Sequence, residues 1–444
     1  MQHYDVIVIG SGVAGQTAAS ELAGAGKRVA MTDSREYGGT CALRGCEPKK
    51  VLFTASEVVE RTRAQSGNGP VGPVALDWAS LVAFKRSFTD PVPKRMEEWL
   101  AGAGVTLLHG AARFVSEGAV EVGGERFGAN HFVVATGATP RPLGIPGGDL
   151  VHDSERFMDA DELGDRVAFI GGGYVSFEFA HMADAAGARV TILNRGPRVL
   201  ETFDHDLTAM LVDGYRQAGI EVLTGAAVTE VRRTDGGLEV VCEDRHIITC
   251  DMAVHGAGRV PAVEALDLDA ASVPYGRRGI DVDVFMRSTG NPRVFAAGDV
   301  VAPGLPLTTV ATVQARVAVA NILEPGSAVF SPVVMPSVVF SDPMMASVGL
   351  TEEQATAQGL DVDVRLTDTS GWASSRRIGQ RVSGAKTIVE KATGTIVGAH
   401  LLGHGAGDVI NVFAAAIAGG LTAADLRGAV WAYPTASYEI VYLV

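Results

Sequence analysis

The residues with the clearest capacity for chemistry are two cysteines in the stretch GGTCALRGCEPKK, residues 38–50. Cys41 and Cys46 are separated by four residues, and Lys49 follows closely. In a regular helix, Cα atoms five positions apart lie roughly 8 to 9 Å from each other, which is too far for a disulfide. A disulfide between these two cysteines would therefore require Cys41 to lie before the helix that holds Cys46, or in its distorted first turn, and Gly45 permits that distortion.

Cysteine pairs ligate zinc, cross-link small folds or act as redox couples. A helix N-terminus with a lysine nearby stabilises a thiolate, so this pair is predicted to be redox-active. The zinc interpretation fails on ligand count, because Cys242 and Cys250 lie far along the chain and are expected to be ordinary buried thiols on strands. His400 and His404 have metal-ligand spacing, but Gly403 interrupts the helix they would need, so no metal site is expected.

Two segments of the chain, residues 5–33 and 166–195, repeat one pattern. Each reads as an apolar strand, a glycine-rich turn, a helical stretch and a second apolar strand, which is one βαβ unit. Such a unit binds a dinucleotide whose pyrophosphate lies at the helix N-terminus; the alternative is a glycine-rich packing turn. The glycines that would allow the turn, the close approach of phosphate and the helix packing are Gly10, Gly12, Gly15, Gly171 and Gly173. Ser176 stands where the second copy would carry its last glycine.

The two copies differ at the end of the second strand. Asp33 can accept hydrogen bonds from ribose hydroxyls, as FAD and NAD sites require. The second copy has Asn194 there, followed by Arg195 and Arg198. Two guanidiniums beside a missing carboxylate favour a 2′-phosphate, so NADPH is preferred over NADH as the second nucleotide. The alternative is that both arginines are solvated surface.

Length and composition limit the class of protein. The chain has 444 residues, 47% of them hydrophobic, and a net charge of −14. This acidic balance disfavours nucleic acid and anionic membrane partners, and no apolar run reaches the length of a membrane helix. The N-terminus enters a strand pattern at once without a leader-like segment. We therefore expect an enzyme of the cytoplasm.

The remaining segments indicate the domain organisation. Residues 133–148 read as a strand followed by a proline-rich segment that leaves the first domain. Residues 256–268 and 289–300 read as the segments that return to it. After residue 331 the sequence pattern changes. Residues 333–340 and 387–402 are predicted as strands, and residues 407–419 and 423–429 as helices. The fold class is α/β, with two Rossmann-like domains and an α+β terminal domain on an antiparallel sheet. The predicted boundaries are 1–145, 146–262, 263–330 and 331–444.

The ordered set of motifs resembles the FAD-dependent pyridine nucleotide-disulfide oxidoreductases, which include glutathione reductase, dihydrolipoamide dehydrogenase and mercuric reductase. The motifs are GSGVAG, GGTCALRGCEPKK, ATG, GGGYVSFEFA and AAGDV, followed by the terminal module. The resemblance covers essentially the whole chain. It implies an FAD domain, an NAD(P) domain, a central segment and a dimerisation domain, in a homodimer whose active sites include C-terminal residues of the partner.

The resemblance also implies roles for individual residues. Cys46 would lie against the flavin, Cys41 would face the substrate, and Lys49 would pair with Glu178. Tyr174 would cover the nicotinamide pocket, although it could simply pack on the turn. The further residues that the resemblance places at the cofactors are Gly39, Thr40, Lys50, Ala135, Thr136, Gly137, Gly258, Gly298 and Asp299.

The tail WAYPTASYEIVYLV departs from the thiol-handling members, which carry a His-Pro-Thr motif. Tyr433 replaces the histidine, and an unperturbed phenol titrates near pH ~10, so it is a poor base at neutral pH. The favoured acceptor is a disulfide. The alternatives are a metal ion, a quinone or dioxygen, or a flavin-bound redox sensor whose turnover is incidental. Arg376, Arg377 and Arg381 would contact an anionic substrate or form a solvated loop.

Overall fold

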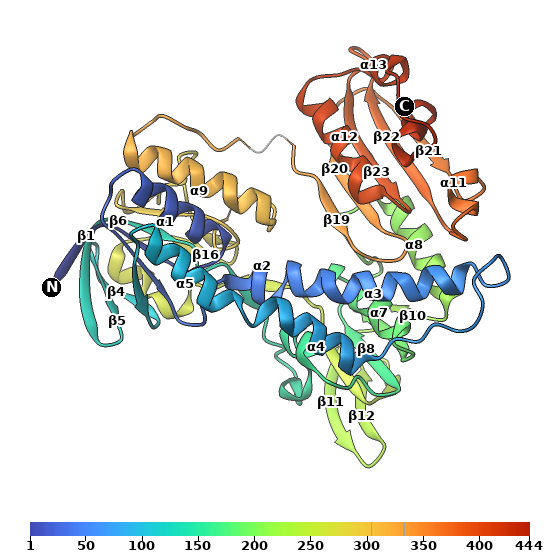
Figure 1. Cartoon of the computed structure of the whole chain (residues 1–444), viewed down its shortest axis with the longest axis horizontal. Helices are drawn as coiled ribbons and strands as arrows, with labels where there is room; N and C mark the ends of the chain where they lie inside the picture. Colours follow the sequence, from blue (N-terminus) through green and yellow to red (C-terminus); the bar gives the residue numbers. More distant parts are fainter. Residues whose placement is uncertain (303, 332–333) are drawn as a thin grey trace. The chain divides into compact units, whose positions relative to one another are not determined.

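The computed structural model describes residues 1–302, 304–331 and 334–444. The chain divides into two compact units (Figure 1). The first holds Met1–Lys50, Ala83–Arg141 and Arg259–Pro332, and the second holds Val51–Val82, Pro142–Gly258 and Val333–Val444. Among the described residues, no helix combines the length and the apolar character that crossing a membrane would demand.

The first unit is built on a sheet of order β3-β2-β1-β6-β5-β4, with β18 paired to β6. Its strands are β1 (Gln2–Ile9), β2 (Val29–Asp33), β3 (Thr106–His109), β4 (Ala112–Ser116), β5 (Ala119–Val122), β6 (Glu125–Val134) and β18 (Val294–Ala296). Strands β3, β2, β1, β6 and β18 run parallel, whereas β4 and β5 are antiparallel. The main helices are α1 (Val13–Gly24), α5 (Val92–Gly102) and α9 (Thr308–Leu323).

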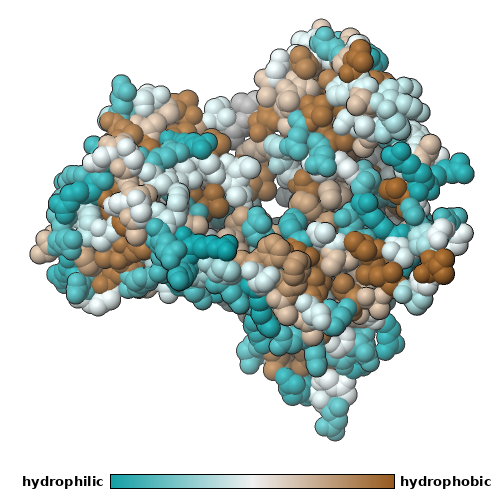
Figure 2. Space-filling view, in the orientation of Figure 1, coloured by the Kyte–Doolittle hydropathy of each residue, from teal (hydrophilic) through white to brown (hydrophobic). Residues whose placement is uncertain are grey.

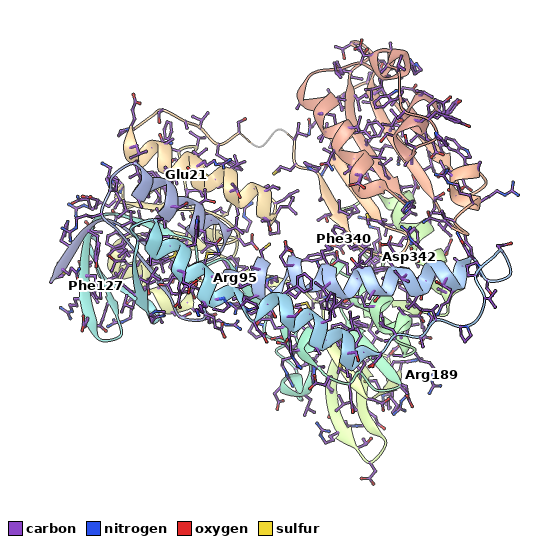
Figure 3. The ribbon with its side chains drawn as sticks, in the orientation of Figure 1. Glu21, Arg95, Phe127, Arg189, Phe340 and Asp342 are labelled. Atoms are coloured by element: carbon purple, nitrogen blue, oxygen red, sulfur yellow. The ribbon has the colours of Figure 1, made fainter. Side chains whose placement is uncertain are left out.

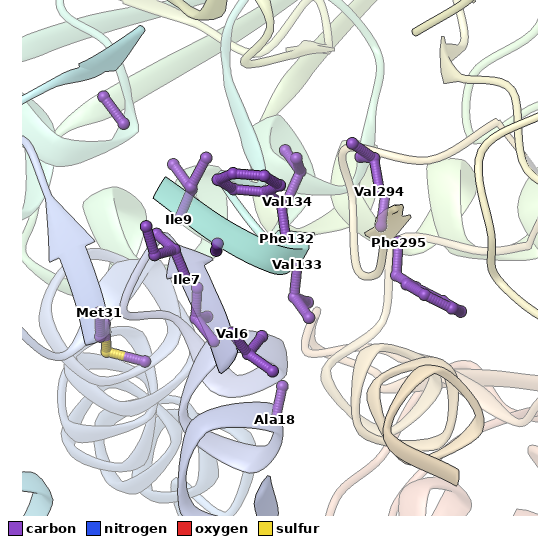
Figure 4. Close-up of a cluster of buried hydrophobic side chains, with 14 of the residues drawn as sticks. Val6, Ile7, Ile9, Ala18, Met31, Phe132, Val133, Val134, Val294 and Phe295 are labelled. Atoms are coloured by element: carbon purple, nitrogen blue, oxygen red, sulfur yellow. The ribbon is translucent and has the colours of Figure 1, made fainter. Parts of the chain in front are cut away.

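The core of this unit lies where the parallel strands meet α1 and α9. Side chains such as Ile7, Met31, Phe132 and Val294 are fully buried there (Figure 4). Continuous apolar strands are expected in a parallel sheet, because helices cover it. A two-stranded ribbon of β7 (Ala138–Pro140) and β15 (Arg259–Pro261) and a short hairpin of β16 (Tyr275–Gly276) and β17 (Gly279–Ile280) complete the unit.

The second unit contains the second βαβ repeat. Its parallel sheet has the order β10-β9-β8-β14, formed by β8 (Arg166–Ile170), β9 (Arg189–Asn194), β10 (Glu221–Thr224) and β14 (Met252–His255). The helices α6 (Ser154–Asp159), α7 (Tyr174–Ala185) and α8 (His205–Ala218) accompany it. An antiparallel sheet of β11 (Val228–Thr234), β12 (Gly237–Cys242) and β13 (Ile247–Cys250) carries Cys242 and Cys250, which are buried free thiols as predicted.

The C-terminal part of this unit is an antiparallel sheet of order β19-β20-β23-β22-β21. Its strands are β19 (Ser337–Val339), β20 (Met345–Gly349), β21 (Val362–Asp368), β22 (Gly384–Glu390) and β23 (Ile396–Leu402). The helices are α10 (Glu352–Ala357), α11 (Ala373–Arg376), α12 (Ala406–Ala418), α13 (Ala423–Gly428) and α14 (Ile440–Leu443). Exposed apolar side chains, brown in Figure 2, are visible on the part of the chain drawn red in Figure 1. The large side chains of this part that are solvent-exposed include Leu366, Leu421, Val430, Tyr433 and Tyr442.

The α/β fold class and the antiparallel terminal sheet are confirmed. The prediction of one strand over residues 387–402 is wrong in detail, because a turn after Glu390 folds this stretch into the hairpin of β22 and β23. The predicted strand at 333–340 shortens to β19, and Val333 lies outside the described residues.

A buried ammonium ties this sheet to the part of the same unit that follows the second βαβ repeat. Lys386 on β22 is 4% exposed and pairs with Asp204 (3.1 Å), Asp206 (2.8 Å) and Glu352 (2.6 Å). Although burial opposes the charge, hydrogen bonds to these three carboxylates hold the pKa of Lys386 above its ordinary range. Removing one partner of a buried ion pair leaves the others uncompensated.

We therefore expect Lys386→Met to lower the free energy of unfolding by about 3–5 kcal/mol. Urea denaturation followed by circular dichroism measures this loss. The matched control is Lys391→Met, which breaks an exposed pair with Asp361 and should cost less than about 1 kcal/mol. Equal losses of unfolding free energy in the two variants would contradict the role of Lys386 as the centre of a buried ion-pair cluster.

Candidate active site

The two cysteines lie on either side of a helix break. Cys41 is in the short helix α2 (Gly39–Arg44), and Cys46 is the first residue of α3 (Cys46–Ala64). Gly45 separates the helices with φ −145° and ψ −110°, so the two side chains are not held at the spacing of one regular helix. Both cysteines are half-buried free thiols.

Thr308, the first residue of α9, brings a third group to the pair. Its Oγ1 lies 3.5 Å from Cys46 Sγ and 3.5 Å from Cys41 Sγ. The hydroxyl has one proton, so it donates to one sulfur at a time, and an anionic sulfur is the stronger acceptor.

The surroundings polarise the two thiols in opposite directions. A hydrogen bond from Cys41 lowers the pKa of Cys46 to about 6, helped by the Thr308 hydroxyl and by the ammonium groups of Lys49 and Lys50. The hydrogen bond with Cys46, together with burial, raises the pKa of Cys41 far above that of an ordinary thiol. At neutral pH the pair therefore holds one thiolate, on Cys46, and one thiol, on Cys41.

Thr308→Val removes the hydroxyl while keeping the shape of the side chain. Because the pKa of Cys46 is lowered, its thiolate is present above pH of about 6 and is lost below it. Losing a hydrogen bond to the anion should raise the midpoint by about one pH unit, since one unit equals 1.36 kcal/mol. A pH titration of the long-wavelength thiolate-to-flavin absorbance in the reduced protein measures the midpoint. Thr308→Ser should keep it, and an unchanged midpoint in Thr308→Val would contradict the role.

The glycine turn before α1 fits a pyrophosphate. A Cβ on Gly12 would meet nothing within 4 Å, which leaves open space at the helix N-terminus. By contrast, a Cβ on Gly10 would overlap the Ala135 carbonyl, and one on Gly15 would overlap the Gly10 carbonyl. Gly39 approaches Gly12 equally closely, with φ +70°. Gly10, Gly15 and Gly39 thus allow the close packing of the loop, and the open space beside Gly12 fits the predicted phosphate.

Two carboxylates in the same unit fit the rest of an FAD molecule. Asp33 Oδ2 accepts from the Ser11 amide and hydroxyl, both at 2.7 Å, which fixes the carboxylate at the end of β2. Asp299 is half-buried, and burial raises its pKa. Among the described residues none hydrogen-bonds to the Asp299 carboxylate, so it can accept a hydroxyl of a bound molecule. Gly298 precedes it with φ +84°, and its amide donates to Gln314 Oε1 (2.8 Å).

The other predicted FAD contacts also lie in the first unit. Ala135 and Gly137 follow β6, and the Thr136 hydroxyl donates to the Ala262 carbonyl at 2.8 Å. Thr40 is an exposed residue of α2, and Lys50 lies in the first turns of α3. The first unit therefore brings together the cysteine pair, the glycine turn and both carboxylates.

The second unit holds the predicted nucleotide loop. Gly171 has φ +107°, Gly173 caps α7, and Gly258 follows β14 with open space around it. Asn194 forms hydrogen bonds within this loop: its Oδ1 accepts from the Gly172 amide (3.0 Å), and its Nδ2 donates to the carbonyls of Gly196 (3.0 Å) and Arg198 (2.7 Å).

That arrangement leaves the loop's charged side chains available. Arg195 and Arg198 are exposed, and neither forms an ion pair with a described carboxylate. Two guanidiniums without counterions form an anion-binding surface.

Two residues of α7 were predicted to act at the flavin and nicotinamide. Glu178 is 1% exposed, and its Oε1 accepts the backbone N–H of Phe340 (2.8 Å), a residue just after β19 that Figure 3 labels. Tyr174 begins α7 and is 42% exposed. Lys49 belongs to the other unit, so its pairing with Glu178 stays a prediction.

Comparison with known proteins decides the family. The pyridine nucleotide-disulphide oxidoreductase family matches residues 4–315, and its dimerisation domain matches residues 335–444. The chain belongs to this family. The predicted family and enzyme class are therefore confirmed, and the chain is an FAD-dependent oxidoreductase that works with NAD(P)H.

Three similar proteins show how far the match to the oxidoreductases extends. A dihydrolipoyl dehydrogenase of Thermus scotoductus is 33% identical and covers 98% of the chain and 96% of its own length. A glutathione reductase of Burkholderia cepacia is 32% identical, and the match covers 100% of the chain and 99% of the length of that reductase. The solved Cu(II) complex of the HOCl-induced flavoprotein disulfide reductase RclA from Escherichia coli is similar in structure, with a TM-score of 0.91 at 26% sequence identity. The match covers 100% of this chain and 99% of the RclA chain.

Tyr433 distinguishes this oxidoreductase from the thiol-handling pattern. It is 76% exposed, and its ring packs edge-on against Tyr438 at 4.8 Å between centroids. The Tyr438 hydroxyl in turn contacts that of Tyr442 at 3.1 Å. The tail therefore presents phenols, as the sequence predicts, in place of the histidine of the thiol-handling pattern.

Sequence reasoning missed two polar groups of this oxidoreductase site, Thr308 and Gln314. Both lie on α9, which reads as a plain apolar helix, and their partners are up to 267 residues away. The only local signal is the pair of threonines that opens the helix.

Proposed function

We propose that the protein reduces a disulfide with NADPH, using the Cys41–Cys46 pair as the relay. The observation that carries this proposal is the placement of the two thiols on either side of the helix break at Gly45, with the Thr308 hydroxyl 3.5 Å from each sulfur. Bound FAD would accept a hydride from the nicotinamide and deliver two electrons to the Cys41–Cys46 disulfide. Residues Gly12, Asp33 and Asp299 would hold FAD.

The cysteine chemistry then balances as two exchanges. Opening the disulfide gives the Cys46 thiolate and the Cys41 thiol. Cys41 Sγ attacks one sulfur of the substrate disulfide while its proton passes to the departing sulfur, so that a mixed disulfide forms and the first substrate thiol is released. The Cys46 thiolate then attacks Cys41 Sγ, which restores the intramolecular disulfide and releases the second substrate sulfur as a thiolate that takes a proton from water.

The assembly is proposed from the family. Residues 1–145 and 263–330 would form the FAD domain with its central segment, 146–262 the NADPH domain and 331–444 the dimerisation domain. The protein would act as a homodimer in the cytoplasm, with Tyr433 reaching the partner's active site and Tyr174 covering the nicotinamide. Lys49 and Glu178 would form an ion pair near the flavin.

The preference for NADPH rests on the two arginines after Asn194, which pair with no described carboxylate. We expect the double variant Arg195→Ala and Arg198→Ala to raise the KM for NADPH at least about 30-fold, which is about 2 kcal/mol. The KM for NADH should change less than about threefold, because NADH lacks the 2′-phosphate. Steady-state kinetics with both coenzymes measure this, and a parallel loss for both would contradict the preference.

A second candidate acceptor is a metal ion, in particular Cu(II). RclA, with a TM-score of 0.91 to this chain, has been solved as a Cu(II) complex. The absence of the usual histidine base also fits an acceptor that needs no thiol protonation, because Tyr433 is a poor base at neutral pH.

Stopped-flow spectroscopy distinguishes the two acceptors. The protein is reduced with one equivalent of NADPH, and the decay of the thiolate-to-flavin absorbance is followed after mixing with disulfides or with Cu(II). Decay with a disulfide supports the first proposal, and decay with Cu(II) alone supports the second. If neither restores the oxidised spectrum faster than dioxygen does, both acceptor assignments are wrong.

A further inference from the structure

A polar cavity of about 530 Å³ lies in the second unit, between the end of α3 and the short helix α11. None of the residues assigned to the redox and nucleotide sites lines it. Figure 2 shows hydrophilic (teal) surface over α11. The residues that line the cavity are Gln65, Asn68, Ala373, Arg376, Arg377 and Gly379.

The two arginines of this cavity have no counterion in the part of the chain that the structure describes. Arg376 and Arg377 are exposed, and neither forms an ion pair with a carboxylate there. On α3, by contrast, Arg61 pairs with Glu57 (2.7 Å) and Arg63 with Glu60 (2.6 Å). In a chain of net charge −14, two adjacent uncompensated guanidiniums in a cavity leave a local positive potential.

The wall of the cavity is fixed by packing. Gln65 Nε2 donates to the Arg377 carbonyl at 3.1 Å, which attaches the loop after α11 to the end of α3. Gly379 has φ +74°, and a Cβ there would overlap the Ala64 carbonyl, so only glycine allows this approach. The loop that carries the arginines is therefore held in place before any ligand binds.

A smaller cavity of about 70 Å³ adjoins Arg377, which lines both. Ser374 lines the small cavity, and its buried Oγ has no hydrogen-bond partner among the described residues. A buried hydroxyl without a partner is costly unless water or a ligand satisfies it. The Ser374 hydroxyl can therefore still form a hydrogen bond with a ligand or water in the small cavity that Arg377 also lines.

We propose that this cavity binds the phosphate group of a small phosphorylated molecule. Adjacent guanidiniums match the geometry of phosphate oxygens, and the side-chain amides of Gln65 and Asn68 offer further hydrogen bonds. The volume lies within the range of about 300–1,000 Å³ seen for small-molecule sites, which exceeds what a bare phosphate ion fills. The ligand therefore carries an organic group of about the size of a nucleoside.

Isothermal titration calorimetry on the FAD-loaded, full-length protein tests this site. The cavity variants described below separate the two sites, because adenosine monophosphate bound at the coenzyme site would give the same heat in all of them. The probes are adenosine monophosphate, inorganic phosphate, and adenosine as the uncharged comparison. We expect adenosine monophosphate to bind with a dissociation constant below about 1 mM, inorganic phosphate more weakly, and adenosine not measurably.

The double variant Arg376→Met and Arg377→Met should weaken adenosine monophosphate binding at least tenfold. Arg381→Met removes a charge from the same segment but not from the cavity, and it should bind as the wild type does. Asn68→Asp places a carboxylate in the cavity and should also weaken binding at least tenfold, which covers the case of a poorly folded double variant. No heat with wild-type protein, or equal affinity in the double variant and Arg381→Met, would overturn the proposal; since no turnover is measured, this result is independent of the redox function.

Discussion

The Cys41→Ser protein should accept electrons from NADPH at the wild-type rate but lose disulfide turnover by at least about 10³-fold, as expected when a nucleophile is removed. Cys46 keeps the groups that lower its pKa, because a serine hydroxyl can replace the Cys41 thiol as hydrogen-bond donor and the Thr308 hydroxyl and the two lysines that follow are unchanged. Its thiolate therefore survives, and a serine hydroxyl cannot form the mixed disulfide. Rapid-mixing reduction of the flavin and steady-state disulfide reduction measure the two quantities separately.

Cys242→Ala is the matched control, because Cys242 is also a free thiol but is buried on β12. It should retain full turnover. If Cys41→Ser keeps disulfide reduction within about tenfold of wild type, the relay is wrong. If Cu(II) reduction persists in Cys41→Ser while disulfide reduction is lost, electrons leave for the metal ion without the Cys41 sulfur.

Gly12→Ala should produce a folded protein that is nearly free of FAD. The added Cβ meets no protein atom within 4 Å, so it projects into the space at the N-terminus of α1. A pyrophosphate there approaches the backbone closely, and a methyl group would prevent it. We expect FAD affinity to fall at least about 100-fold, which is about 2.8 kcal/mol.

Gly24→Ala is the control on the same helix, since a Cβ on Gly24 also meets nothing within 4 Å. It lies in the last turn of α1, away from the glycine turn, so FAD affinity should not change. Fluorescence titration of apoprotein with FAD gives both affinities, and circular dichroism shows whether each variant is folded. If the Gly12→Ala protein purifies with full FAD content, Gly12 does not lie at the FAD pyrophosphate.

Local sequence patterns predicted most of the fold, because each pattern reports on a short stretch. The glycine turns at Gly10 and Gly171, with the apolar strands around them, place two parallel sheets and their helices. The break at Gly45 follows from the geometry that a disulfide demands. Periodicity failed at residues 387–402, where both strands of a buried hairpin are apolar and only the turn after Glu390 separates them.

The site was less predictable, because its groups meet through tertiary contacts. Thr308 reaches Cys41 across 267 residues, and nothing in an apolar helix marks its first residue as a neighbour of sulfur. The coenzyme contact of Asn194 stays a prediction, and the sequence did not show the three side-chain hydrogen bonds that Asn194 forms within the loop. Residue type alone does not show with which groups a side-chain amide forms its hydrogen bonds.

The hydrogen bonds of Asn194 have a consequence for the evolution of coenzyme choice. They set the shape of the loop without help from the exposed side chains of Arg195 and Arg198, which form no ion pair with described carboxylates. Exchanging those two side chains should therefore leave thermal stability unchanged, because nothing in the core depends on them. Lineages carrying this loop could change from one coenzyme to the other through a few surface substitutions, with no intermediate that folds poorly.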